Sequence, residues 1–163
     1  MTMRSGPEIL PLVEAHEPAA SNAIAGTCNE IYLGNANGCW IIVHEDFAVD
    51  ANHLVLTVHE GATAAEALAG TSVIAATFPG WFCVASQTSD AMVAQTLAAT
   101  YTLDGVTAGN NSLYCFYIPA SILTPGNDWI QADFAAGDAG NIASVLYMLD
   151  GVRYKQATPP SAI

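Results

Sequence analysis

Basic residues are almost absent from this chain. Among its 163 residues, only Arg4, Arg153 and Lys155 are basic, against 15 acidic residues, and the formal net charge is −12. Binding to nucleic acid requires clustered Lys and Arg that displace counterions from phosphates, and attraction to an anionic membrane depends on the same side chains. Because residues 5–152 contain neither Lys nor Arg, the sequence predicts no nucleic-acid partner and no membrane partner.

Long hydrophobic runs are absent as well. No stretch approaches the ~20 apolar residues that span a bilayer, and prolines and acids interrupt residues 1–20 where a signal peptide would need an apolar centre. The sequence therefore predicts that the protein stays in the compartment where it is made, unless it leaves as part of a larger particle.

Sequence motifs with specific chemistry are also lacking. GxSxG, HExxH, GxGxxG and the P-loop pattern do not occur. The four cysteines, Cys28, Cys39, Cys83 and Cys115, contain no CxxC pair of the kind that builds zinc sites, and we interpret them as small buried hydrophobes within strands. We therefore predict no catalytic residue, no cofactor and no metal, in a protein that is not an enzyme.

One weak metal-site hypothesis concerns two histidines. His44 and His59 lie in consecutive apolar segments. If those segments pair as strands, both imidazoles could reach one face, with Glu45 or Glu60 nearby. The sequence does not give the register, and a shift of one residue turns a side chain to the opposite face. The alternative is that both histidines face solvent on a sheet.

What the chain has in abundance is apolar residues. They make up 52% of the sequence, and only 11% of residues are charged, whereas about 25% is typical of soluble domains. The length fits one domain. Since there are too few charges to cover its surface, small apolar residues lie outside or part of the surface is buried against a partner.

From residue 28 onward, short apolar runs are separated by Gly, Asn, Asp and Pro. In residues 53–60, Leu54, Leu56 and Val58 alternate with other side chains, which is the period of a strand with one buried face. Only residues 62–70 have good helix propensity, for one or two turns. About eight short strands without long helices predict an all-β protein with two antiparallel sheets packed face to face, or a barrel. The other runs lie at 28–33, 39–46, 71–78, 80–85, 112–118, 128–134 and 141–149.

The first 25 residues differ from the rest. Prolines at 7, 11 and 18 discourage both a helix and an interior strand, so residues 1–25 are predicted to form an extended N-terminal arm, with a disordered tail as the alternative. Residues 26–156 are predicted to form the β-sandwich domain, and 157–163 a C-terminal tail. An apolar group within the arm indicates that it docks on another surface; this group is Ile9, Leu10, Leu12 and Val13.

Several aromatic residues fall within the predicted strands: Trp40, Trp81, Tyr114, Tyr117 and Trp129. Exposed aromatic rings can stack on sugars, which makes a carbohydrate-binding β-sandwich module an alternative function. Core packing and subunit contacts are the more common use of such side chains.

The order of these segments resembles that of tailed-bacteriophage capsid cement, or head-decoration, proteins. A strand ending in His followed by Gly-Ala and alanines lies at residues 59–64, and an aromatic strand leads into an "IPASIL" corner at 114–123. A strand "WIQADF" follows at 129–134, and the last strand leads to Arg153, Tyr154 and Gln156. The resemblance covers roughly residues 28–156, and the four cysteines and the N-terminal arm are departures from the family's pattern.

The resemblance implies a jelly-roll-like sandwich with at most one or two short helices. It also implies a homo-oligomer, with a trimer favoured, made in the host cytoplasm and bound to the major capsid protein on the outer surface of the virion head. Another phage head or tail protein is a further alternative. The candidate assembly contacts are Arg4, Ile9, Leu10, Leu12, Val13, Arg153 and Tyr154.

Overall fold

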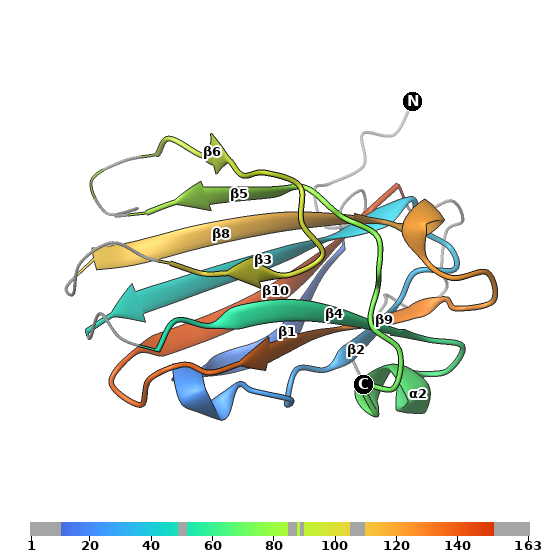
Figure 1. Ribbon diagram of the computed structural model, residues 1–163, viewed down its shortest axis with the longest axis horizontal. Coiled ribbons are helices and arrows are strands. Elements are labelled where there is room, and N and C mark those ends of the chain that lie inside the picture. The colour runs from blue at the N-terminus through green and yellow to red at the C-terminus, as the bar shows by residue number, and fades with distance from the viewer. Residues whose placement is uncertain (1–10, 49–51, 85–87, 89, 105–109, 152–163) are drawn as a thin grey trace, which may run out of the picture.

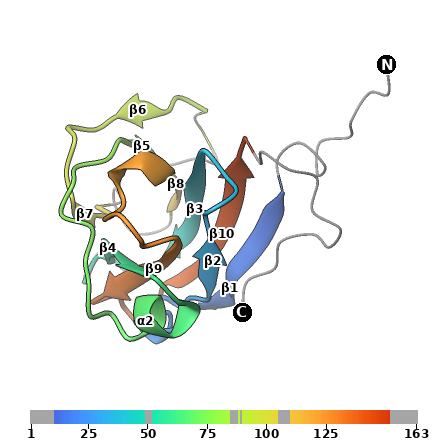
Figure 2. The same ribbon diagram turned by 90° about the vertical axis from the view of Figure 1, so that its right-hand side faces the viewer.

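Two antiparallel β-sheets pack face to face around one core (Figures 1 and 2). The computed structural model describes residues 11–48, 52–84, 88, 90–104 and 110–151. The all-β sandwich predicted from the alternating apolar runs is confirmed.

One sheet has six strands and the other has four. The strands of the larger sheet are β1 (Leu12–Ala20), β3 (Gly38–Phe47), β5 (Gly80–Cys83), β6 (Val93–Ala94), β8 (Asn110–Pro119) and β10 (Ile142–Asp150), in the order β1-β10-β3-β8-β5-β6. The strands of the smaller sheet are β2 (Glu30–Tyr32), β4 (Val55–Gly61), β7 (Tyr101–Thr102) and β9 (Trp129–Ala135), in the order β2-β9-β4-β7.

The strands pair from the two ends of the chain inward. The pairs are β1 with β10, β2 with β9, β3 with β8, and β4 with β7, and successive pairs alternate between the two sheets. This nested pairing is the topology of a jelly roll, as the sequence resemblance implied. The β5–β6 hairpin is an addition at the β8 edge of the larger sheet.

Part of the predicted N-terminal arm belongs to the sandwich. Leu12–Ala20 is extended, as predicted, but it forms edge strand β1 against β10, with register shifts between Glu14 and His16 and between His16 and Ala19. Pro18 lies within the second irregularity, where an edge strand tolerates a residue without an N–H. Sheet pairing therefore begins before residue 26, the predicted start of the domain.

The only α-helix in the described residues is α2 (Ala64–Leu68), accompanied by the 3₁₀ turns η1 (Ser21–Ala23) and η2 (Ala120–Ile122). Its start is a variant of the capping box, in which the glutamate reaches the N–H of the residue before the N-cap Thr63. Thr63 Oγ1 accepts from the Glu66 N–H at 3.3 Å, and Glu66 Oε2 accepts from the Ala62 N–H at 2.9 Å. Figure 2 shows α2 beside β2 and β9 at one end of the smaller sheet.

Gly61 permits α2 to lie against β4. A Cβ at this position would be 2.5 Å from the backbone nitrogen of Ala67, so we expect Gly61→Ala to lower the free energy of unfolding by about 1–3 kcal/mol through overpacking. Urea denaturation measures the change. Ala62→Ser is the matched control, since it adds one heavy atom at the exposed neighbouring position, and we expect a change within about 0.5 kcal/mol. Equal midpoints for the two variants would contradict the prediction.

The aromatic segment at residues 112–134 supplies both the core and the surface. Tyr114, Phe116 and Phe134 point inward and are fully buried, whereas Tyr117 and Trp129 are only half-buried. The inward rings of β8, Tyr114 and Phe116, pack against the rings of Phe78, Phe82 and Tyr101. The centroid distances are 4.8–6.4 Å. The segment therefore both fills the sandwich and leaves aromatic side chains available outside it.

Three of the four cysteines are buried as predicted, although Cys28 precedes β2 and is not within a strand. Cys28, Cys39 and Cys83 are buried, Cys115 is half-buried, and all four are free thiols. Burial is the main cause that raises the pKa of Cys28 to about 12, and burial also raises the pKa of Cys39. Thiols with raised pKa values are poor nucleophiles, so Cys28 and Cys39 contribute packing.

Candidate assembly surface

The outward side chains of the six-stranded sheet form an apolar surface, which we call the outer face. Successive side chains of a strand point to opposite sides, and on β3, β8 and β10 buried core residues alternate with these half-buried or exposed ones. The apolar members of the outer face are Leu12, Trp40, Ile42, Trp81, Leu113, Cys115, Tyr117, Ile142, Leu146 and Met148, and the polar His44 and Ser144 also point outward.

Strand register brings these side chains into contact across the sheet. Residues directly opposite each other on neighbouring strands form the basic packing unit of a sheet surface. Two apolar rows result, Leu146–Ile42–Cys115–Trp81 and Met148–Trp40–Tyr117. The apolar side chains are therefore contiguous over four strands, with Ile42 near the middle.

Three aromatic rings lie together on the outer face. The Trp40 ring centroid is 5.4 Å from that of Trp81 and 4.9 Å from that of Tyr117. The Tyr117 hydroxyl donates to Asp150 Oδ2 at 2.9 Å. Partial burial and then this carboxylate raise the pKa of Tyr117, so the phenol stays neutral and holds Asp150 at the margin of the face.

Acidic side chains lie around the apolar rows. Glu14 is on edge strand β1, Asp46 is near the end of β3 and Asp150 ends β10. No Lys or Arg occurs anywhere in the described part of the chain. An apolar, aromatic centre with a charged margin is the composition of a protein–protein interface.

The candidate contacts predicted from the sequence have different locations. Leu12 lies on the outer face and is 57% exposed, whereas Val13 is 8% exposed and packs in the core. The remaining candidates, Arg4, Ile9, Leu10, Arg153 and Tyr154, lie outside the described residues.

Sequence reasoning did not identify Ile42 and Leu146 as surface residues, and it considered Trp40 as one only for sugar stacking. The available signal was that residues 39–43 and 145–149 are apolar at both alternating positions. In an antiparallel sheet with one solvated face, the outward positions are ordinarily polar. Continuous apolar strands therefore indicated that both faces of the larger sheet are apolar.

The middle of the outer side of the four-stranded sheet is polar. Glu30, Gln131 and His59 form a row across β2, β9 and β4, and His59 Nε2 is 3.6 Å from Asp133 Oδ2. Gly70 covers the imidazole, since a Cβ there would be 2.8 Å from His59 Cε1. His59 is thus a packed side chain beneath a covering segment.

The hypothesis that His44 and His59 share one face is wrong. His44 is on β3 of the larger sheet and His59 is on β4 of the smaller one, so the two strands do not pair and the two side chains lie on opposite sides of the sandwich. Within the described ranges, no group of three or more His, Cys, Asp or Glu side chains is placed to hold a metal ion.

The five aromatics considered for sugar stacking are divided among three locations. Trp40, Trp81 and Tyr117 are together on the outer face, Tyr114 is in the core, and Trp129 packs against Tyr32 on the smaller sheet. Trp81 and Tyr117 are tilted by 40° and 43° relative to Trp40. The three rings therefore do not form a flat platform.

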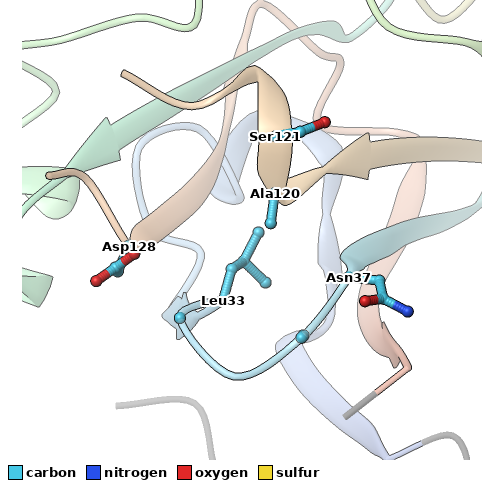
Figure 3. Close-up of a pocket in the computed structure, with 7 residues that line it drawn as sticks. Leu33, Asn37, Ala120, Ser121 and Asp128 are labelled. Carbon is cyan, nitrogen blue, oxygen red and sulfur yellow. The ribbon is translucent and has the colours of Figure 1, made fainter. Parts of the chain in front are cut away.

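A hollow of about 430 Å³ opens at one end of the sandwich, where the turn after β2 meets the corner after β8 (Figure 3). Leu33 and Ala120 point toward each other within it, whereas the Asp128 carboxylate and the Asn37 amide lie on opposite sides. Its polar groups do not converge on one point, so we assign it no ligand.

No helix in the described residues is long and apolar enough to cross a membrane. Comparisons of the chain with protein-family models, with curated proteins and with solved structures find no significant match.

Proposed function

We propose that this protein is a structural virion component, a capsid cement or head-decoration protein that binds the outside of an icosahedral tailed-phage head and stabilises it. The observation that carries the proposal is the contiguous apolar outer face. Jelly rolls are common in viral capsids but also occur in lectins and cupins, so the fold alone does not decide the function. The sequence resemblance adds independent support.

The outer face is suited to permanent association. Burying a large apolar side chain that was fully exposed contributes about 1.5–3 kcal/mol, and half-buried side chains such as Ile42 and Leu146 contribute part of this. Long-lived interfaces are more hydrophobic than ordinary protein surface. A face of ten apolar side chains would therefore stabilise a shell by joining neighbouring subunits.

The acidic margin indicates which partner this face would contact. A second copy would bring another acidic margin toward Glu14, Asp46 and Asp150, whereas a capsid surface with Lys or Arg around an apolar patch would be complementary. We therefore assign the outer face to the major capsid protein. The homo-oligomer, with a trimer favoured, would use other surfaces.

Mass measurement tests this proposal directly. We expect native mass spectrometry to show a small homo-oligomer, and we expect the protein to sediment with heads of a matching tailed phage at a fixed ratio to the capsid protein. Heads that already carry their own decoration protein are the control, because their sites are occupied. A monomer that binds none of a broad panel of undecorated heads would overturn the proposal.

The aromatic group on the outer face favours one alternative, a carbohydrate-binding module. Trp40, Trp81 and Tyr117 lie beside the Asp150 carboxylate, and aromatic rings with a nearby acid can bind sugars. A glycan array read by tryptophan fluorescence distinguishes the two functions. Saturable binding to a defined glycan, lost in Trp40→Ala, would favour this alternative.

A further inference from the structure

Glu45 is a buried carboxyl group without a described role. It lies on β3 and points into the sandwich, and it is fully buried. In the described part of the chain no hydrogen bond of ordinary geometry reaches either carboxyl oxygen or the hydroxyl of its cross-strand neighbour Ser112, although the Ser21 and Asn141 side chains lie close enough to Glu45 to lower its pKa. Buried polar groups without partners are rare in folded proteins and each requires an explanation.

Two turns close the end of the sandwich over this carboxyl. The Ser21 N–H donates to the Asn141 carbonyl at 2.8 Å. Ser21 Oγ donates to the Asp138 carbonyl and accepts from the Asp138 N–H, each at 2.9 Å. The turns at residues 21–23 and 136–141 are therefore joined, and we call them the end cover. Ser21 and Asn141, which belong to it, also lie beside Glu45.

We propose that Glu45 is a proton-controlled latch for this end cover. The protonated carboxyl is compatible with the closed turns, because a neutral group can remain in an apolar interior. The ionised carboxylate is not, because a buried charge without a counter-charge is strongly unfavourable. Ionisation therefore opens the two turns and admits water to the carboxylate, with one proton released to solvent.

Among the described residues, the surroundings of Glu45 provide no positively charged Lys or Arg side chain. From β8 the titratable neighbour is Tyr114, whose pKa is raised mainly by burial and also by Glu45 and Asp104. From the end cover it is Asp138, and from β10 the opposite residue is the apolar Ala143. No Lys or Arg of the described ranges is available as a partner.

The pKa of Glu45 supports this proposal. Burial raises it from 4.5 to about 7, although the Ser21 and Asn141 side chains lower it in part. At pH values between 4.5 and about 7, Glu45 is protonated in the folded protein but ionised in the unfolded chain. This difference in proton binding stabilises the folded protein at low pH. The resulting stabilisation is therefore complete below about pH 4.5 and is lost as the pH rises through about 7.

Comparison of the protein with Glu45→Gln tests the latch. For the unmodified protein, we expect Glu45 to raise the unfolding equilibrium constant by roughly 25-fold between pH 5.5 and pH 8, and we expect this component to be absent in Glu45→Gln. Asp46→Asn is the matched control, because it removes one charge at the next, outward-facing position. Identical pH dependence in the protein and Glu45→Gln would overturn the proposal.

A second measurement does not depend on the variant folding. Hydrogen exchange at the Ser21 and Asp138 amides, both bonded within the end cover, should lose protection from pH 6 to pH 8 beyond the intrinsic change in exchange rate. Carboxyl NMR of the unmodified protein should also show one glutamate that titrates near neutrality. Unchanged protection, or glutamates that all titrate below about pH 5, would equally overturn the proposal.

Discussion

Ile42→Lys is expected to weaken binding of the protein to phage heads at least about 100-fold, because about 2.8 kcal/mol corresponds to that ratio. Ile42 lies near the middle of the outer face, between Leu146 and Cys115. A lysine ammonium at this point would be buried without a partner in the complex, which costs at least this much. In the free protein its stem can lie along the sheet with the charge in water, so the fold should persist.

Binding is measured by co-sedimentation over a range of protein concentrations, and folding by circular dichroism and thermal unfolding. Thr57→Lys is the matched control, since Thr57 is a half-buried, outward residue on a central strand of the opposite sheet. We expect Thr57→Lys to bind as the unmodified protein does. Equal affinity of both variants would show that the outer face is not the binding surface, whereas equal loss would exclude a specific role for it.

Tyr147→Phe is expected to lower the free energy of unfolding by about 2–4 kcal/mol, a large part of the stability of a small domain. Tyr147 projects from β10 across the core and is fully buried. Its hydroxyl donates to the Asn29 carbonyl at 2.9 Å and accepts from the Ala132 N–H at 2.8 Å. These two groups lie just beyond the point where the β2–β9 ladder ends, so the phenol completes the ladder and joins the two sheets.

The Phe variant keeps the ring and removes one oxygen, which leaves a buried donor and a buried acceptor without partners. Urea denaturation measures the loss in free energy of unfolding, and an unchanged m-value would show that the change lies in stability alone. Tyr32→Phe is the control, because Tyr32 is 37% exposed on the outer side of the smaller sheet, and we expect a change within about 0.5 kcal/mol. A similarly small effect of Tyr147→Phe would mean that water replaces the hydroxyl.

Local patterns were sufficient to predict the layers of the fold. The alternation at Leu54, Leu56 and Val58 placed these residues on the buried side, where the structure has them. Likewise, the short helix at residues 64–68 lies within the alanine-rich run at residues 62–70 that was predicted to form one or two helical turns. Strand alternation and helix propensity depend only on residues close together in the sequence. These residues are also close together in the folded chain, so such patterns can be read without knowing the tertiary structure.

Long-range pairing could not be predicted in this way. His44 and His59 were considered partners because their strands are consecutive, but in a jelly roll consecutive strands change sheets. Glu45 has the same sequence appearance as the exposed Asp46 beside it, and only the register with Ser112 and Ala143 places it under the end cover. Similarly, the apolar outer face forms only when β10, β3 and β8 align.

The nested order of strands has a consequence for how the protein is made. Among the strands of the described residues, β10 is the last to leave the ribosome, yet it lies between β1 and β3 in the larger sheet. Until it emerges, the first strand has no neighbour to pair with, and contacts so distant along the chain form slowly. Nascent chains therefore expose unpaired strand edges until β10 has been synthesised, which favours aggregation. Synthesis of β10 is then the step after which the larger sheet can form completely.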